Sequence, residues 1–266
     1  MSLILSSGKQ EIIFNRPLMN SAGMLGFSDE TRHWIKLQAL GAFITNPTSL
    51  YPRAPARAPI ATTGDYGTLL HTGLPNPGID QVIKIHHMRW NRMPIPVILH
   101  IIAQAGEEIT AMLDRLEGLH SVQAIEIGLQ GEEFALDREV IQAALTGILP
   151  VIVRLPMDTH IEKLKTFEEL GVAAIALGPP RGTVFENGER VSGRLYGPAL
   201  LPQMINCIEQ AIGFFSCPLI AGSGIFNRAD AERLLSMGVQ AMQLDTVLWT
   251  DPDQLIEPPI SYGSDN

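Results

Sequence analysis

The sequence predicts a single-domain α/β protein of the (β/α)8, or TIM barrel, class, and three observations point to it. The 266 residues are enough for one such barrel. Eight short runs rich in Val, Ile, Leu and Ala lack apolar–polar alternation, which is typical of parallel strands buried on both faces. Amphipathic segments separate the runs, and a glycine ends two of them just before the next run. A doubly wound open sheet is the alternative, but the Gly-rich turn after its first strand is missing.

Each apolar run is a predicted barrel strand, and each segment between two runs is a predicted helix. The strands are expected at 17–23, 41–46, 96–102, 124–129, 150–156, 173–178, 218–224 and 241–246. The helices are expected at 31–40, 78–90, 106–119, 137–145, 160–170, 198–212 and 228–237.

The chain after the eighth strand is too short and too rich in proline for a full eighth helix. We therefore expect a truncated final helix. One flank of the barrel would then need a cover, either from a second subunit or from the N-terminal segment. This predicts a homodimer or a hetero-oligomer.

Three segments exceed a minimal barrel. Residues 3–16 read as two short strands with a turn at 6–9, a predicted N-terminal β-hairpin that closes the barrel bottom. Residues 47–77 contain six prolines and no helical pattern, which predicts an ordered and functional excursion above the second strand. Residues 183–197 carry the Asn187-Gly188 signal of a second hairpin. All of it is expected to form one domain over residues 1–266.

Composition limits the partners. The formal net charge of −9 argues against nucleic acid and anionic membranes, which need basic surfaces. No apolar run reaches about 18 residues, and none has signal-peptide flanks. Cys207 and Cys217 lack metal-ligand spacing and predict two reduced, buried thiols. We expect a cytoplasmic protein with a small-molecule substrate and no metal.

Several motifs resemble one known family in order and spacing. They are "NRPLMNSAG" (15–23), "GAFITNPTSLYPRAPARAPI" (41–60), "GLPNPGID" (73–80), "PVIVRLP" (150–156), "GRLYGPALLP" (193–202) and "PLIAGSGIFNRADAERLLSMGVQAMQLDT" (218–246). The chain resembles the dihydroorotate dehydrogenases from about Leu3 to Trp249. The resemblance implies an FMN-containing barrel, a flavoprotein oxidoreductase of pyrimidine biosynthesis.

The resemblance also implies where FMN would lie. The flavin ring would pack over Ser21, Ala22 and Gly23, where small residues let it approach the backbone. Arg154 stands where the family has a lysine beside the flavin N1–O2 edge, and a fixed cation there stabilises reduced flavin. The alternatives are an ordinary tight turn at 21–23 and a buried ion pair between Arg154 and Glu126.

The remaining expected contacts come from the same comparison. Asn46 takes the place of a second family lysine near the flavin. The Gly-rich turn Gly222, Ser223 and Gly224 and the pair Asp245–Thr246 would face the phosphate. The substrate would meet His71, Leu74 and Asn76.

Some positions depart from the family. Asp245 replaces a glycine, and its carboxylate would repel a phosphate unless it caps a backbone N–H or pairs with a cation such as Arg228. Gly128 and Gly178–Pro179 replace polar substrate contacts, and Gly131 lies near the place of the Cys or Ser base. No base is recognisable, so the catalytic residue is unknown. Glu132, Glu133, His71 and His100 are possible replacements.

Three functions stay open at this point. The first is an FMN-dependent oxidoreductase acting on CH–CH groups, with an altered substrate pocket. The second is a flavin-free barrel that serves as a binding or partner subunit. The third is another barrel enzyme, such as a phosphate-sugar lyase or isomerase, although no strand ends in the lysine it would need.

Overall fold

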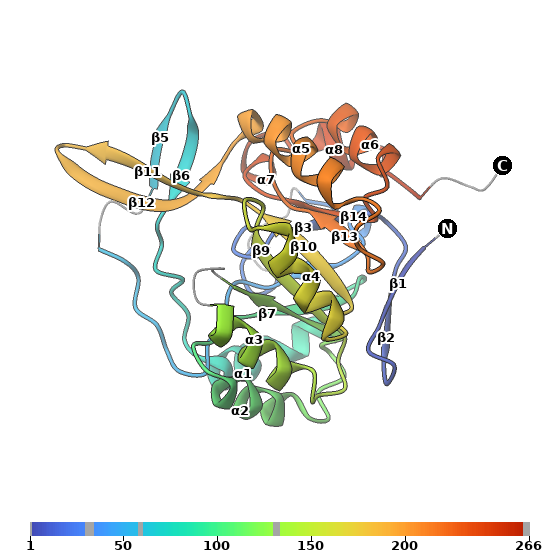
Figure 1. The fold of residues 1–266 in the computed structure, drawn as a ribbon. Coiled ribbons are helices and arrows are strands. Elements are labelled where there is room, and N and C mark those ends of the chain that lie inside the picture. Colours follow the sequence, from blue (N-terminus) through green and yellow to red (C-terminus); the bar gives the residue numbers. More distant parts are fainter. Residues whose placement is uncertain (1, 30–34, 58–60, 130–133, 263–266) are drawn as a thin grey trace.

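A barrel of eight parallel strands forms the centre of the computed structural model, which describes residues 2–29, 35–57, 61–129 and 134–262 (Figure 1). The sheet order is β3-β14-β13-β10-β9-β8-β7-β4. A parallel bridge between Met19 and Ala42 joins the two end strands. The strands confirm the eight apolar runs: β3 Leu18–Asn20, β4 Phe43–Ile44, β7 Val97–Ile101, β8 Ala124–Gly128, β9 Val151–Pro156, β10 Ala174–Gly178, β13 Leu219–Ala221 and β14 Ala241–Leu244.

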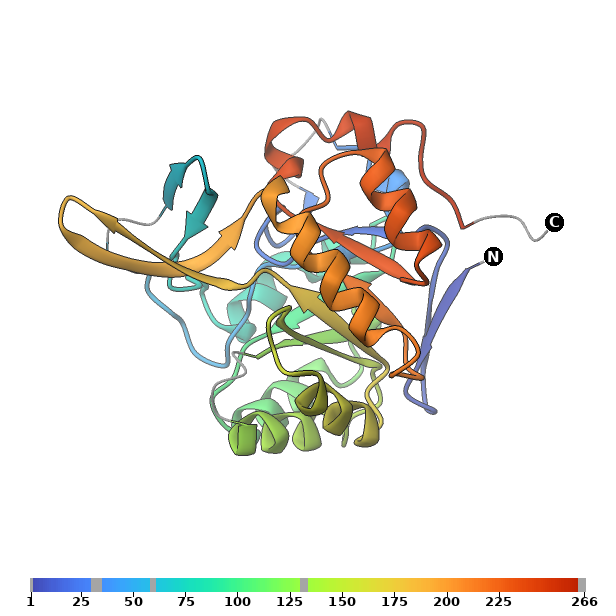
Figure 2. The same ribbon diagram turned by 45° about the horizontal axis from the view of Figure 1, so that its top comes forward.

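Six helices surround the strands and confirm the helical segments expected between residues 78 and 237 (Figure 2). They are α1 Ile79–Trp90, α2 Gly106–Leu116, α3 Phe134–Ala144, α4 Ile161–Glu169, α5 Leu201–Ala211 and α6 Arg228–Ser236, with a 3₁₀ turn at Pro198–Leu200 before α5. The helix expected at 31–40 falls partly outside the described residues, and its described remainder holds only a 3₁₀ turn at Leu37–Ala39.

The start of α6 illustrates how the sequence sets a boundary. The Asn227 side chain accepts a hydrogen bond from the Asp230 backbone N–H, at 3.0 Å. The Asp230 carboxylate in turn accepts from the Asn227 N–H, at 3.2 Å. This reciprocal capping box satisfies two backbone donors that the helix itself leaves unpaired.

The N-terminal hairpin closes the barrel bottom, as expected. Its strands are β1 Leu3–Ser6 and β2 Glu11–Phe14. Their inward side chains share one buried apolar cluster with residues inside the barrel, namely Leu3, Leu5, Ile12 and Phe14 with Met19, Ile44, Ile98, Ile152 and Ile220. Burial of this cluster fixes the hairpin to the barrel because apolar area is removed from water on both sides.

The chain ends in two single-turn helices, α7 Val247–Thr250 and α8 Asp253–Ile256, which confirms the truncated final helix. Val247, Leu248, Leu255 and Ile256 are buried in the main apolar core. The C-terminal segment itself therefore covers this flank. The expectation of a further cover from a second subunit or the N-terminal segment stays a prediction, as does the oligomeric state.

The two insertions combine into one antiparallel sheet of four strands, with the order β11-β12-β6-β5. The strands are β5 Ala61–Gly64, β6 Gly67–Leu70, β11 Arg181–Glu186 and β12 Glu189–Tyr196. Asn187 and Gly188 have φ values of 51° and 82°, which is the backbone of the expected hairpin turn. We call this the insertion sheet. It extends from the barrel on the side opposite to β1 and β2 (Figures 1 and 2).

In the described part of the chain, no helix has the length and the apolar character that are needed to cross a membrane.

Candidate functional site

A cavity of about 760 Å³ lies at the barrel mouth, below the insertion sheet. Its floor includes Ala22, Gly23, Asn46 and Gly128, which follow or end barrel strands. Its walls come from β6, β12 and the loops between 47 and 57 and between 71 and 75. The volume and the mainly apolar lining are those of a small-molecule site, and the carboxyl ends of barrel strands are where such sites lie.

The structure brings five of the expected contacts together in this cavity: Ala22, Gly23, Asn46, His71 and Leu74. Gly23 has φ +87°, a backbone conformation that L side chains rarely adopt. The remaining expected residues do not line the cavity.

Asn76 is one of these, because its side chain is used inside the loop. Its Oδ1 accepts hydrogen bonds from the backbone N–H groups of Ser49 and Gly78, at 3.2 and 3.0 Å. Its Nδ2 donates to the carbonyl of Leu74 at 3.1 Å. Asn76 therefore shapes the cavity wall by holding two loops together.

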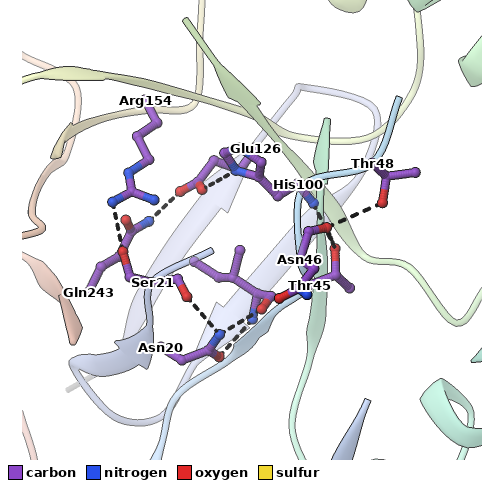
Figure 3. Close-up of polar contacts among 10 residues, drawn as sticks. Asn20, Ser21, Thr45, Asn46, Thr48, His100, Glu126, Arg154 and Gln243 are labelled. Atoms are coloured by element: carbon purple, nitrogen blue, oxygen red, sulfur yellow. Dashed lines mark hydrogen bonds and ion pairs between the residues drawn. The ribbon is translucent and has the colours of Figure 1, made fainter. Parts of the chain in front are cut away.

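Arg154 lies within β9, and its side chain points toward Ser21 (Figure 3). Its Nη2 donates to Ser21 Oγ at 2.7 Å. The guanidinium lies against the Cα of Gly178, where an added Cβ would stand 2.7 Å from Nε. Gly178 thus makes room for the arginine. Neither Arg154 nor Ser21 lines the cavity, so the structure does not bring either of them to a ligand there.

Glu126 is the centre of the polar network beneath the mouth and is 0% exposed. His100, its register partner on β7, binds Glu126 Oε1 through Nδ1 at 2.6 Å. Gln243 Nε2 donates to Oε2 (Figure 3). Burial opposes the charge, but hydrogen bonds from His100 and Gln243 and the charge of Arg154 outweigh it and hold the pKa of Glu126 below its usual range.

This network bears on the alternative that Arg154 forms a buried ion pair with Glu126. Arg154 interacts electrostatically with Glu126, as the ion-pair alternative expects, while its hydrogen bond goes to Ser21. The sequence missed Gln243. Gln243 could have been found only from the strand register of a closed barrel, because barrel closure is what brings β14 near β8.

Asp245 occupies the end of the barrel where the resemblance placed the FMN phosphate. The side chain is 1% exposed. Its Oδ1 accepts from the backbone N–H and from the Oγ1 of Thr246, the latter at 3.1 Å. The carboxylate therefore caps its own following residues and takes the backbone donors that a Gly-Thr pair would offer to a phosphate. It does not pair with Arg228, which contacts Glu232 and the carbonyl of Pro258.

The Gly-rich turn beside it is filled by protein. Gly224 has φ +80°, and an added Cβ would stand 2.4 Å from the backbone nitrogen of Leu201 at the start of α5. Ser223 is buried beneath the same turn. The turn thus packs the barrel against α5.

Burial raises the pKa of Asp245 from 3.8 to about 6, although Thr246 and Arg154 favour the charged form. The folded protein therefore holds this proton more tightly than the unfolded chain does. Between pH 4 and 6 the folded state carries the proton and the unfolded state does not, so stability falls as the pH rises through this window and the cost is complete above it.

We expect Asp245→Asn to stabilise the protein by about 1–3 kcal/mol at about pH 8, with the gain vanishing near about pH 4. Urea unfolding of both proteins across this range measures it. A gain that is the same at all pH values contradicts the assignment of the cost to the buried charge.

Among the described residues that line the cavity, His71, Glu108 and Asp137 carry side chains of the kinds that act as general bases, and His71 is exposed there. His100 is committed to Glu126. Gly131, Glu132 and Glu133 lie outside the described residues. Cys207 and Cys217 are free and half-buried, less buried than expected, and burial raises the pKa of the Cys217 thiol to about 12.

Together, the barrel, the bottom hairpin and the cavity at the carboxyl ends of the strands define a small-molecule-binding (β/α)8 barrel. The family model "Dihydroorotate dehydrogenase" matches residues 5–169, more than half of the chain. The chain belongs to the dihydroorotate dehydrogenase family, whose named members are oxidoreductases.

Curated relatives agree with this membership. The catalytic subunit of dihydroorotate dehydrogenase B (NAD(+)) of Desulforudis audaxviator is 26% identical in an alignment of 262 residues, and the match covers 91% of this chain and 85% of the relative. Dihydroorotate dehydrogenase A (fumarate) of Lacticaseibacillus paracasei is 29% identical in an alignment of 255 residues, and the match covers 85% of this chain and 86% of the relative.

A solved structure shares the fold. DHODH from Eimeria tenella, crystallised in complex with ferulenol, superposes with a TM-score of 0.68 at 15% identity and covers 97% of this chain and 88% of its own.

The residues present fit one end of FMN and not the other. Ala22, Gly23 and Gly128 leave a side-chain-poor floor on which a flat ring could lie. At the phosphate end, the carboxylate of Asp245 already holds the Thr246 donors, and α5 packs against Gly224. The phosphate would meet a buried carboxylate in place of backbone N–H groups, so FMN does not fit this site as the resemblance implied.

Proposed function

We propose that this member of the dihydroorotate dehydrogenase family is a flavin-free barrel that binds a small organic molecule in the mouth cavity and serves as a binding or partner subunit. The observation that carries the proposal is the hydrogen bond that the Asp245 carboxylate accepts from the Thr246 backbone N–H. We further propose that the cavity binds its ligand without a resident redox group.

The size of the electrostatic repulsion between a phosphate and the Asp245 carboxylate supports this proposal. A phosphate oxygen about 4 Å from an ionised carboxylate is repelled by about 4 kcal/mol at an effective dielectric constant of about 20. Loss of the charge-assisted hydrogen bonds that Thr246 would have given adds to this cost. A repulsion of this size weakens binding by about a thousandfold.

The mouth residues have roles that need no cofactor. Arg154 balances Glu126 and Asp245 inside the barrel. His71, Leu74 and Asn46 line the cavity, where they bind and orient the ligand. Asn76 fixes the loops around it.

The visible absorption spectrum tests the proposal. We expect the purified protein to be colourless and to stay so after incubation with FMN and desalting. Asp245→Gly frees the Thr246 donors and removes the charge, so it is expected to retain flavin with at least about tenfold higher affinity. Asp245→Asn removes the charge alone and should gain less. Asp65→Gly, in the exposed turn of β5 and β6, is the control that loses a distant carboxylate.

A second candidate is the FMN-dependent oxidoreductase with an altered substrate pocket, acting in pyrimidine biosynthesis. The floor formed by Ala22, Gly23 and Gly128 favours it. Stoichiometric flavin in the wild-type protein would contradict the flavin-free proposal and favour this candidate in its place.

A further inference from the structure

His100 uses only one nitrogen of its ring in the buried network beneath the cavity. Nδ1 lies 2.6 Å from Glu126 Oε1, and Glu126 is 0% exposed (Figure 3). The ionised Glu126 carboxylate can only accept, so Nδ1 carries the hydrogen of this bond. In a neutral imidazole the other nitrogen, Nε2, then has a lone pair and is an acceptor. The network therefore fixes one tautomer of His100.

The second nitrogen of this ring lies directly below the cavity floor. Glu126 and Gly128 are two residues apart on β8 and face the same side of the strand, with Gly128 nearer the mouth. A Cβ added at Gly128 would stand 2.5 Å from His100 Nε2, and Gly128 itself lines the cavity. The ring thus reaches from the buried carboxylate up to the floor, and the missing side chain at position 128 leaves Nε2 uncovered.

The contacts of the two ring nitrogens differ. The side chain of His100 is 6% exposed, and no described residue forms a hydrogen bond with its Nε2. Buried side-chain nitrogens generally have a hydrogen-bond partner, so an unpaired one beside a cavity indicates a ligand. Gln243 donates to the other oxygen of Glu126, which keeps the carboxylate from turning away from the ring. A carboxylate held behind a histidine orients the ring and stabilises the imidazolium that forms when Nε2 takes a proton.

We propose that His100 transfers protons to and from a ligand bound over Gly128, that Glu126 positions it, and that the ligand is a small carbonyl compound. The carbonyl group is needed because imidazole can remove a proton from carbon only where the electron pair can move onto an oxygen. The body of the ligand is apolar, since apolar side chains line much of the cavity, among them Met24, Leu50, Leu70 and Ile102.

The proposed step needs no other reactant. The C–H bond next to the carbonyl breaks, its proton goes to Nε2, and its electron pair forms the C=C bond of an enolate whose charge rests on the carbonyl oxygen. His100 becomes an imidazolium paired with Glu126. Return of a proton to the same carbon completes an exchange, and return to the far end of a conjugated double bond gives an isomer. The reaction class is therefore a proton shift that consumes no oxidant or reductant.

This inference rests on the proposed function, because it places the ligand over Gly128 in a cavity without a flavin ring. The absorption spectrum tests the flavin-free function on the protein alone. The experiments on proton transfer follow carbon-bound hydrogen, so the two proposals can fail separately.

Exchange of carbon-bound hydrogen in D₂O tests the proton transfer, with cyclohexanone and dihydroxyacetone as probes. Proton NMR follows the loss of the C–H signals next to the carbonyl group. We expect the wild-type protein to exchange one or both probes at least about tenfold faster than His100→Asn does. The asparagine amide lies near the place of Nδ1, so it can keep the hydrogen bond to Glu126 while Nε2 is removed. Thermal unfolding checks that this variant is folded.

Glu126→Gln tests the positioning role separately. Gln243 donates to Oε2 of Glu126, so the oxygen of the new amide should stay on Gln243 and its NH₂ group should face His100. His100 Nδ1 must then accept, which moves the hydrogen to Nε2. Nitrogen NMR of the ring is expected to show the opposite tautomer, and the exchange of the probes should fall to the level of His100→Asn. Exchange at the wild-type rate with the opposite tautomer would contradict the role of Glu126.

His86→Asn is the matched control. His86 is also buried, bonds Ser28 Oγ through Nδ1 at 3.2 Å and lies outside the cavity, so its loss should leave the exchange unchanged. The proposal is overturned if both probes exchange equally fast with the wild-type protein and with His100→Asn. It is also overturned if His71→Asn abolishes the exchange while His100→Asn keeps it, since the exposed histidine of the cavity would then be the base.

Discussion

Replacing Arg154 by Met is expected to destabilise the protein by about 3 kcal/mol at about pH 8. Glu126 and Asp245 are almost completely buried, and Arg154 acts electrostatically on both. Without the guanidinium, two buried carboxylates lose their compensating cation. Urea unfolding of the variant and the wild-type protein measures the loss.

The pH dependence separates this electrostatic role from simple packing. At about pH 5 Asp245 carries a proton in the folded state, so the loss should shrink there. Arg154→Lys keeps the charge and gives up the hydrogen bond to Ser21, which costs about 1 kcal/mol. In the cycle of Arg154→Met with Asp245→Asn, we expect a coupling of about 1–2 kcal/mol. Equal losses at both pH values together with zero coupling would show that Arg154 acts through packing alone.

Substitution of Gly128 by Ala is expected to destabilise the protein by about 1–3 kcal/mol, and by Asn by more. An added Cβ would stand 2.5 Å from Nε2 and 2.8 Å from Cε1 of His100. The imidazole cannot move aside without breaking its hydrogen bond to the buried Glu126. The asparagine that the family resemblance places here is thus incompatible with His100. Thermal unfolding of the two variants provides the measurement.

Gly106→Ala is the matched control for Gly128→Ala. Its added Cβ would approach Oε1 of Glu139 at 3.0 Å, and this far end of a flexible side chain needs to shift by only a few tenths of an ångström, which keeps the hydrogen bond it accepts from the Gly106 N–H. We expect little change in Tm for the control. The His100→Ala/Gly128→Ala pair should recover part of the loss caused by Gly128→Ala. If Gly128→Ala is as stable as the control, the packing of His100 against this glycine does not restrict the site.

Local sequence patterns predicted the barrel because each of its strands is a continuous apolar run buried on both faces. The hairpin turn at Asn187–Gly188 was equally readable, since its backbone needs positive φ at both residues. The pairing of β6 with β12 was not readable. It joins segments more than a hundred residues apart, and neither carries a local signal for the other.

The site was predicted at the level of its position and less well at the level of roles. Ala22, Gly23 and His71 reach the cavity because the carboxyl ends of parallel strands and the loops that follow them meet there. Asn76 has the right residue type but spends its hydrogen bonds inside a loop, which only coordinates reveal. For Asp245 the sequence left repulsion, pairing and capping open, and the geometry selects capping.

The insertion sheet joins two distant parts of the chain into a single structural unit. A two-stranded hairpin is marginal in water by itself, and here β5–β6 and β11–β12 support each other through the contact of β6 with β12. Deleting either hairpin would leave the other with an unpaired strand edge. It would also remove part of the cavity wall. A graft of this ligand specificity onto another barrel of the family would therefore have to carry both insertions at once, although they are separated by most of the barrel in the sequence.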